Sequence, residues 1–351
     1  MFVSELRCAV CGRAYASDEV AYTCPDCGQA GTLDVLYDIK ALGAAVSRQD
    51  IARSADPTLW RYRPLLPLPA KAAVPPLAVG GTPLYNALRL AADLGLAQVW
   101  VKDDGRNPTG SLKDRASAVV VARAMAQGIE VVTTASTGNA AAALAGLAAS
   151  VGLPAVIFVP ASAPEAKIAQ LLTYGAHVLL VQGNYDSAFD LAVQAAERYG
   201  WYNRNTGMNP YTVEGKKTVA YEIAEQLGWQ TPDAVVLSVG DGNIISGVHK
   251  GFRDLLALGW IERMPRLIGV QADGSAACYQ AWKRGQNPAT MLPIASHTVA
   301  DSIAADLPRD RVRAVRAVRE TGGAFVSVPD DAILAGIPVL ARLSGVFAEP
   351  A

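Results

Sequence analysis

The chain has 351 residues, of which 51% are hydrophobic, so it is long enough to bury a large core and to form more than one domain. Its 31 basic and 32 acidic residues nearly cancel and form no block of like charge, which argues against a nucleic acid or an anionic membrane as a partner. The apolar runs are short and are interrupted by Gly, Pro or charged residues, so no membrane span is expected. Residues 1–7 lack the basic and apolar regions of a signal peptide, and a cytoplasmic location is the default expectation.

Four of the five cysteines form two Cys-x-x-Cys pairs near the N-terminus: Cys8, Cys11, Cys24 and Cys27. Each pair presents two thiolates from one tight turn, and two facing turns make a tetrahedral Cys₄ zinc site. Gly12 and Gly28 follow the pairs, where the backbone is expected to turn back sharply. Two disulfides or four free thiols are the alternative, and disulfides are disfavoured in a chain without an export signal. Because four cysteines leave no open position for water, the pattern predicts a structural zinc ion (Zn) on a ribbon of residues 1–38. Cys278 lies far away in sequence and is interpreted as a small core residue.

The rest of the chain alternates between strand and helix patterns. The last strand of the ribbon is expected over residues 32–37, and residues 39–79 are interpreted as a helix and a proline-rich linker. Buried strands are predicted over residues 99–102, 131–134, 155–159, 177–181, 234–239 and 267–270. Helices are predicted between some of them, over residues 138–150, 164–174 and 187–199. This spacing is typical of an α/β fold with parallel sheets and right-handed crossovers.

Residues 107–115, Asn-Pro-Thr-Gly-Ser-Leu-Lys-Asp-Arg, are the most informative segment. Pro108 and Gly110 break regular structure, and Ser111 is a plausible N-cap for the helix that follows. Asp114 lies in the first turn, where a negative charge suits the helix dipole. Lys113 therefore stands at the start of a mostly apolar helix, although ammonium groups are rarely buried without a partner. Desolvation lowers the pKa of a lysine and frees its amine to form a Schiff base, so Lys113 is the predicted catalytic residue.

This segment resembles the fold-type II enzymes that use pyridoxal 5′-phosphate (PLP), and it is most similar to the threonine synthase family. The motif Ser-Thr-Gly-Asn at residues 136–139, the Gly-rich loop at residues 240–244 and the segments 60–67, 80–84, 209–210 and 214–215 agree with that resemblance. The resemblance runs from about residue 60 to the last residue. It implies an α/β fold with two open parallel-sheet domains after the zinc ribbon. The catalytic region would span residues 80–351, with a smaller sub-domain at about residues 115–210.

Two strand-to-helix loops are candidate binding sites. The hydroxyls and helix-end amides of Ser136, Thr137 and Gly138 can hold a carboxylate, and the resemblance assigns them the substrate carboxylate and assigns Asn139 the ring hydroxyl of the cofactor. The second loop consists of Gly240, Asp241, Gly242, Asn243 and Ile244. Its glycines allow amides to converge in a nest for the cofactor phosphate, as the resemblance implies, and the Asp241 carboxylate is expected to face outward. An ordinary capped helix start and a simple glycine turn are the alternatives.

The resemblance also implies a mechanism. Lys113 would hold PLP and then act as the general base at the substrate α-carbon, while the PLP ring takes up the carbanion charge. In threonine synthase this chemistry expels the γ-phosphate of O-phosphohomoserine, and water then adds at the β-carbon to give threonine.

One position departs from the family pattern. Threonine synthases commonly have an arginine two residues after Asn-Pro, where this chain has Thr212. A hydroxyl cannot replace the bidentate guanidinium as a phosphate ligand, although Lys216 and Lys217 are near enough in sequence to compensate. Two alternatives stay open: a β-replacing enzyme that acts on O-phosphoserine, similar to cysteate synthase, and a non-catalytic protein on a degenerate enzyme fold.

The family pattern also extends past the end of the sequence. Residues 345–351 look like the segment that enters a further helix and strand, and that strand usually carries the Ser or Thr that faces the PLP ring nitrogen. The sequence therefore predicts a truncated C-terminus. The expected partner is a small amino-acid phosphate substrate. The sequence does not determine the oligomeric state, for which a homodimer is the working expectation.

Overall fold

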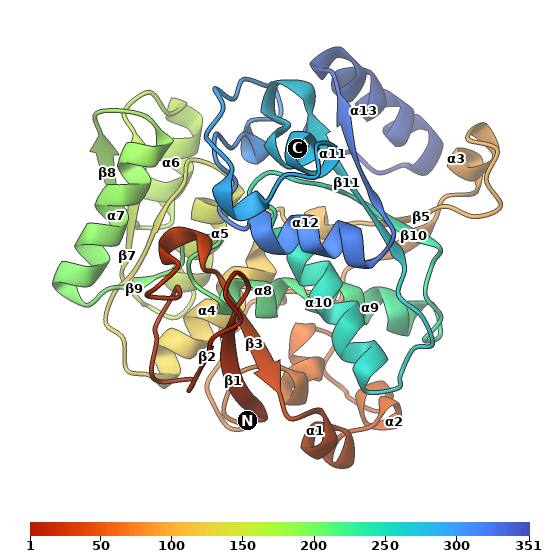
Figure 1. Cartoon of the computed structure of the whole chain (residues 1–351), viewed down its shortest axis with the longest axis horizontal. Helices are drawn as coiled ribbons and strands as arrows, with labels where there is room; N and C mark the ends of the chain where they lie inside the picture. Colours follow the sequence, from red (N-terminus) through yellow and green to blue (C-terminus); the bar gives the residue numbers. More distant parts are fainter. The chain divides into compact units, whose positions relative to one another are not determined.

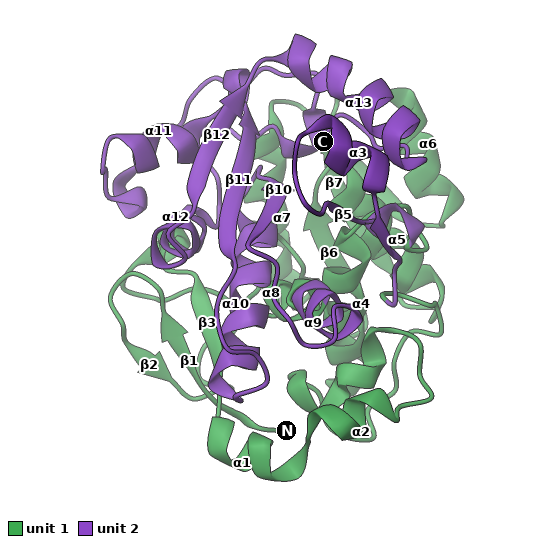
Figure 2. Ribbon diagram, turned by 90° about the vertical axis from the view of Figure 1, so that its right-hand side faces the viewer, with its two compact units in different colours: residues 1–80, 107–218 green, residues 81–106, 219–351 purple.

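The computed structural model describes residues 1–351, which form two compact units (Figures 1 and 2). Unit 1 contains residues 1–80 and 107–218, and unit 2 contains residues 81–106 and 219–351. The chain therefore passes between the units three times, and each unit is assembled from two separate stretches.

Unit 1 begins with a small antiparallel sheet in the order β2-β1-β3. Its strands are β1 (Val3–Cys8), β2 (Ala14–Tyr15) and β3 (Leu33–Tyr37). Cys8 ends β1 opposite Leu33 of β3, so strand pairing brings the first cysteine pair beside the segment that follows the second pair. Two short helices come next, α1 (Ile39–Ala45) and α2 (Arg48–Ala52). Each begins at a side-chain cap, formed by Asp38 for α1 and by Ser47 for α2.

The larger sheet of unit 1 is parallel and has the order β8-β7-β6-β9. Its strands are β6 (Val132–Ala135), β7 (Ala155–Pro160), β8 (His177–Val181) and β9 (Tyr202–Asn203). The helices of this part are α4 (Lys113–Ala126), α5 (Asn139–Ala149), α6 (Glu165–Thr173), α7 (Tyr185–Tyr199) and α8 (Tyr211–Lys216). Helices α4 and α5 pack together and are buried along most of their length, which explains why α5 and the middle of α4, residues 118–122, are apolar on all sides.

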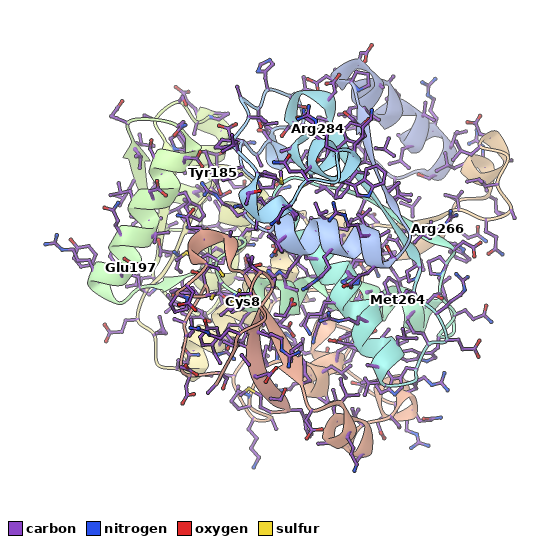
Figure 3. The ribbon with its side chains drawn as sticks, in the orientation of Figure 1. Cys8, Tyr185, Glu197, Met264, Arg266 and Arg284 are labelled. Atoms are coloured by element: carbon purple, nitrogen blue, oxygen red, sulfur yellow. The ribbon has the colours of Figure 1, made fainter.

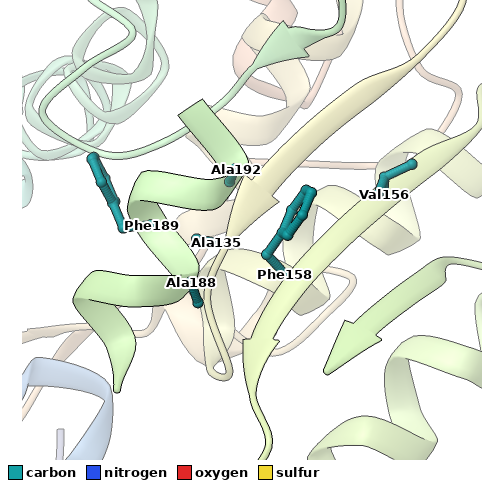
Figure 4. Close-up of a cluster of buried hydrophobic side chains, with 6 residues drawn as sticks. All are labelled: Ala135, Val156, Phe158, Ala188, Phe189 and Ala192. Atoms are coloured by element: carbon teal, nitrogen blue, oxygen red, sulfur yellow. The ribbon is translucent and has the colours of Figure 1, made fainter. Parts of the chain in front are cut away.

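Helix α7 packs on the larger sheet of unit 1 (Figure 4). The buried side chains at this contact are Ala135, Val156 and Phe158 from the strands and Ala188, Phe189 and Ala192 from the helix. The helix begins at Tyr185, before the predicted residue 187, because the Asn184 side chain accepts the Ser187 amide at 3.0 Å and caps it. It ends at Gly200, whose φ of +70° is the left-handed conformation that favours glycine.

Unit 2 contains a second parallel sheet, in the order β10-β11-β12. Its strands are β10 (Ala234–Ser238), β11 (Arg266–Ala272) and β12 (Ala324–Val328). Its helices are α10 (Asn243–Ala257), α11 (Ala277–Lys283), α12 (Arg311–Glu320) and α13 (Asp330–Ser344). Helix α9 (Thr218–Gln226) also belongs to this unit, except for its first residue, Thr218. An antiparallel pair, β4 (Leu84–Asn86) and β5 (Trp100–Lys102), is connected through α3 (Leu88–Asp93). Cys278 of α11 is fully buried, which agrees with its interpretation as a core residue.

The predicted α/β fold with two parallel sheets is confirmed, but the predicted burial of three strands, β5, β8 and β10, is wrong. Strand β5, predicted to be buried over residues 99–102, pairs antiparallel with β4 and leaves 37% of Trp100 exposed. Strand β8 is an edge of its sheet, with Leu180 55% exposed, and strand β10, predicted to be buried over residues 234–239, is an edge of the unit 2 sheet, with Val236 66% exposed. An apolar run identifies a strand but does not identify its neighbours, and the neighbours determine burial. No helix of the structure has both the length and the hydrophobicity needed to cross a membrane.

Candidate active site and metal centre

The four N-terminal cysteines converge, and Figure 3 labels the first of them, Cys8. The sulfur atoms of Cys8, Cys11, Cys24 and Cys27 all lie within 4.8 Å of one another, and the Sγ atoms of Cys11 and Cys24 are 3.8 Å apart. A tetrahedral zinc ion with Zn–S bonds of about 2.3 Å separates its sulfur ligands by roughly 3.8 Å. Gly31 makes the approach possible, because a Cβ atom there would lie 2.7 Å from the Cβ atoms of both Cys24 and Cys27. The cluster is therefore compatible with zinc.

The surroundings of Cys24 favour the thiolate that a metal requires. Burial opposes the charge, yet hydrogen bonds from the Tyr15 hydroxyl and from the amides of Cys27 and Asp26 lower the pKa of Cys24 to about 6. The Tyr15 oxygen lies 3.0 Å from the Cys24 sulfur. Gly12 and Gly28 have φ angles of +75° and +57°, so both glycines after the cysteine pairs adopt the left-handed conformation that their predicted turns require.

Lys113 is the first residue of α4 and is half-buried. The preceding turn is fixed by Asp114, whose fully buried carboxylate accepts the Thr109 amide at 2.7 Å and also accepts the Thr109 hydroxyl. The Ser111 hydroxyl accepts the Lys113 amide at 3.3 Å, but Leu112, not the predicted Ser111, occupies the N-cap position. The chain therefore presents Lys113 from a rigid turn at the start of a buried helix.

Two glycines bring neighbouring elements close to this turn. A Cβ atom on Gly215 of α8 would lie 2.0 Å from the carbonyl oxygen of Arg115, two residues after Lys113, so the backbones of α4 and α8 touch. A Cβ atom on Gly146 of α5 would lie 2.8 Å from the Cγ2 atom of Thr109. The position of Lys113 thus depends on close packing between α4, α5 and α8.

The loop of Ser136, Thr137 and Gly138 connects β6 to α5, and Asn139 is the first residue of α5. The Ser136 hydroxyl accepts the Gly138 amide at 3.2 Å, and Gly138 occupies the N-cap position without a side-chain cap. All of these residues are partly exposed. An accessible helix start without a side-chain acceptor suits the binding of a carboxylate.

Residues 203–209 connect this loop to the lysine helix. The Asn205 side-chain oxygen accepts the Thr134 hydroxyl at 2.9 Å and the Ala135 amide at 2.7 Å, at the end of β6. The Arg204 guanidinium donates to the hydroxyl of Ser117, one helical turn after Lys113, at 3.2 Å. Neither side chain is exposed by more than 1%. Sequence reasoning missed both residues, for which the only signal is a pair of polar residues directly after a short strand.

The residues predicted to bind a substrate phosphate are engaged in unit 1. The Thr212 hydroxyl donates to the Asn209 carbonyl at 2.8 Å, and Thr212 is fully buried. The Lys217 ammonium lies 2.7 Å from a carboxylate oxygen of Glu214 and 4.1 Å from the centre of the Tyr37 ring, and it is also fully buried. Contact between either side chain and a substrate would require these interactions to change.

In unit 2, the loop from Gly240 to Ile244 joins β10 to α10. Gly242 has a φ of +88°, and a Cβ atom there would lie 2.6 Å from the Cβ atom of Ala314. A Cβ atom on Gly240 would lie 2.8 Å from the Cα atom of Ile303. Both positions therefore require glycine, in a loop at the start of a helix, which is the arrangement that binds phosphate in many proteins.

The start of α12 holds this loop in place. The Asp241 carboxylate accepts the Arg309 amide at 3.1 Å, and the Asp241 carbonyl accepts the Asp310 amide at 2.8 Å. The Asn243 side chain donates to the Asp310 carboxylate at 2.9 Å, and that carboxylate also pairs with Arg313 at 2.6 Å. The side chains of Asp241 and Asn243 are thus engaged by the segment that begins α12, while the loop backbone carries the candidate nest.

Comparisons with known proteins agree with these features. Residues 76–351 match the family described as pyridoxal-phosphate dependent enzyme. A threonine synthase of Methanosarcina acetivorans is 41% identical over 347 residues, which cover 99% of this chain and 84% of the relative. A threonine synthase of Methanocaldococcus jannaschii is 38% identical over 347 residues, which cover 98% and 84%. The crystal structure of a threonine deaminase from T.th. has a TM-score of 0.66 at 22% identity, over 87% of this chain and 89% of that one, which shows a shared fold.

The parallel sheets, the lysine at a helix start and the glycine loop are the features of a PLP enzyme of fold type II. Within unit 1 the half-buried Lys113 fits an aldehyde-bearing cofactor, and within unit 2 the loop that requires Gly240 and Gly242 fits a phosphate group. This chain belongs to the pyridoxal-phosphate dependent enzyme family, within the group of the threonine synthases. The resemblance stated from the sequence is therefore confirmed.

Proposed function

We propose that this protein is a PLP-dependent lyase that converts O-phosphohomoserine and water into threonine and phosphate. The observation that carries the proposal is the 41% identity to a threonine synthase over nearly the whole chain. Lys113 at the start of α4 supports it, because a non-catalytic protein has no need of a lysine held in so constrained a turn.

The proposed cofactor contacts are the three that the sequence predicts. Lys113 would hold PLP covalently, Asn139 would contact its ring, and the loop of Gly240, Asp241, Gly242, Asn243 and Ile244 would bind its phosphate through backbone amides. The hydrogen bond from the Arg309 amide to the Asp241 carboxylate supports an orientation of that carboxylate away from the phosphate. When bound, PLP supplies an electron-withdrawing ring that stabilises negative charge at the substrate α-carbon.

The proposed roles of the protein side chains follow from the reaction. The Lys113 amine removes the proton from the α-carbon, and Ser136, Thr137 and Gly138 hold the substrate carboxylate. A proton then leaves the β-carbon, the bond between the γ-carbon and the phosphate oxygen breaks, and phosphate departs with the electron pair. The γ-carbon gains a proton to become the methyl group, water adds its oxygen to the β-carbon and gives up one proton, and a proton returns to the α-carbon to complete threonine.

Thr212 and Lys217 complete the proposed substrate set, and Thr212 also motivates a second candidate substrate. A buried threonine in place of a guanidinium removes a bidentate phosphate ligand. O-phosphoserine carries its phosphate one carbon closer to the α-carbon, so a β-replacement reaction on O-phosphoserine would place that phosphate at a different point of the site.

The proposal also includes one structural zinc ion bound by Cys8, Cys11, Cys24 and Cys27, because their sulfur atoms have the spacing of a tetrahedral site. It places the enzyme in the cytoplasm, where such thiols stay reduced.

Phosphate release from O-phosphohomoserine and from O-phosphoserine tests the function. Release of phosphate with formation of threonine from O-phosphohomoserine is the expected result. Turnover of O-phosphoserine alone would establish the second candidate. A purified protein that shows no yellow absorbance with PLP and acts on neither compound would refute both and would indicate a non-catalytic homologue.

A further inference from the structure

Two tyrosines connect the zinc ribbon, defined as residues 1–38, to the segment 203–217 of unit 1. Tyr22 lies between the two cysteine pairs, and its hydroxyl accepts the Asn203 amide at 2.8 Å. Its ring also lies 6.3 Å from the ring of Tyr202, measured between ring centres. This contact fixes the point at which the chain leaves β9.

The second tyrosine contacts the other end of the same segment. Tyr37 ends β3, and its hydroxyl donates to the buried Glu214 carboxylate of α8. Lys217 completes the group, since its ammonium pairs with Glu214 at 2.7 Å and lies 4.1 Å from the Tyr37 ring centre. Glu214 and Lys217 are both fully buried, and a buried pair that loses one hydrogen-bond donor is destabilised more than an exposed pair.

The segment between these contacts carries residues of the proposed substrate site. Asn203 accepts the Asn209 side-chain amide through its carbonyl at 2.8 Å, and the Asn209 carbonyl accepts the Thr212 hydroxyl at 2.8 Å. The Tyr22 contact is therefore two hydrogen bonds away from Thr212. Tyr37 acts on the same short helix, α8, from the side of Glu214.

We propose that Tyr22 and Tyr37 are positioning residues through which the zinc ribbon sets substrate affinity, while attachment of the cofactor to Lys113 does not depend on them. This rests on the proposed function, because Thr212 and Lys217 of this segment are assigned to the substrate there. Each hydroxyl holds one end of the segment, and the folded ribbon holds both tyrosines in place. A structural change in the ribbon should therefore displace Asn209 and Thr212 before it affects Lys113.

The test uses the full chain loaded with PLP and zinc, with Tyr22→Phe, Tyr37→Phe and the double variant. Each substitution removes one hydroxyl and keeps the ring. Tyr199→Phe is the matched control, because it removes a phenol hydroxyl from the same unit at a side chain that is 60% exposed. Zinc content, PLP absorbance, unfolding temperature, KM and kcat are measured for all variants, with O-phosphohomoserine and O-phosphoserine as substrates.

The expected result is a KM that rises roughly threefold in each single variant and roughly tenfold in the double variant, since each substitution removes one hydrogen bond, with zinc content and PLP binding unchanged. Tyr199→Phe should match the wild type. If the wild type acts on either substrate and the double variant has the same KM, the positioning role is refuted and the proposed function stands. A wild type that acts on neither substrate refutes the proposed function and the positioning role with it. A double variant that loses PLP as readily as it loses substrate shows a general structural role and overturns the proposal.

A second arm tests the route from the ribbon. Cys24→Ser should raise KM in the wild-type background and add no further rise in the Tyr22→Phe, Tyr37→Phe background, because the contacts that transmit the change are already removed. An equal rise in both backgrounds would show that the ribbon acts by another path. If Cys24→Ser does not fold, the tyrosine variants decide the question.

Discussion

Replacement of Gly215 by alanine tests the close packing that places Lys113. The new Cβ atom would lie 2.0 Å from the Arg115 carbonyl oxygen and 2.6 Å from the carbonyl carbon. Because both are backbone atoms, no side chain can rotate away, and α4 and α8 must separate by roughly 1 Å to reach an ordinary contact. Overpacking of this kind costs about 3 kcal/mol, at the upper end of the usual range, and the better helix propensity of alanine returns about 1 kcal/mol. We expect a net loss of about 2 kcal/mol.

That loss should lower the unfolding temperature by about 4 °C, the small shift typical of a chain of this size. A displacement of roughly 1 Å at the start of α4 should also lower kcat by about 100-fold, because proton transfer from the α-carbon requires close alignment of the Lys113 amine. Thermal unfolding with saturating PLP measures the first effect, and phosphate release from O-phosphohomoserine measures the second.

Gly336→Ala in α13 is the matched control. A Cβ atom at Gly336 would meet nothing within 4 Å, and its φ is outside the left-handed range. The same substitution should therefore stabilise the protein by about 0.5–1 kcal/mol and leave turnover unchanged. A Gly215→Ala protein that unfolds at the wild-type temperature and retains wild-type kcat would refute the argument that contact between α4 and α8 sets the position of the lysine.

Three further outcomes are expected. Lys113→Ala should abolish the yellow absorbance and turnover, and borohydride reduction of the wild type should fix PLP on Lys113; a modified peptide that carries another lysine would contradict the assignment. Freshly purified protein should contain one zinc ion per chain, and a folded Cys24→Ser variant should lose zinc and retain PLP; absence of zinc from the wild type would rule out the metal site. Asp310→Asn should weaken PLP binding about tenfold, because it removes a charged acceptor from Asn243 and the ion pair with Arg313; unchanged affinity in an equilibrium titration would show that α12 does not support the loop.

The parts of the fold that the sequence predicts are those with a local cause. The ribbon follows from the spacing of its cysteines, and the strands of the parallel sheets follow from apolar runs such as residues 155–159 and 177–181. The start of α4 follows from the turn residues before Lys113. The antiparallel pairing of β4 with β5 does not follow, because a three-residue strand carries too little pattern to identify its partner.

For the candidate site, too, the sequence predicts the residues that have a local cause. Lys113 and the two strand-to-helix loops stand out because glycine and a helix start mark them in the sequence. The support around them does not stand out, since it depends on contacts between residues far apart. Asn205 lies beside Thr134 only because β9 pairs with β6, and Tyr37 reaches Glu214 across 177 positions of the chain. The engagement of Lys217 by Glu214 is likewise invisible until α8 and β3 are placed together.

The three crossings of the chain between its units have a consequence for biosynthesis. Residues 81–106 leave the ribosome early, yet their partners in unit 2 are made only after residue 218. Lys102, for example, pairs with Glu222 at 2.7 Å and donates a hydrogen bond to Gln226 at 2.9 Å. Both partners are synthesised more than a hundred residues after Lys102, so these contacts cannot form until then. Unit 1 can complete its fold once residue 218 has emerged, since domains fold as units during synthesis. We therefore expect a nascent chain in which the lysine-bearing half is protease-resistant while the β4–β5 segment is still cleavable, and in which chaperone demand is concentrated on that early, unpartnered loop.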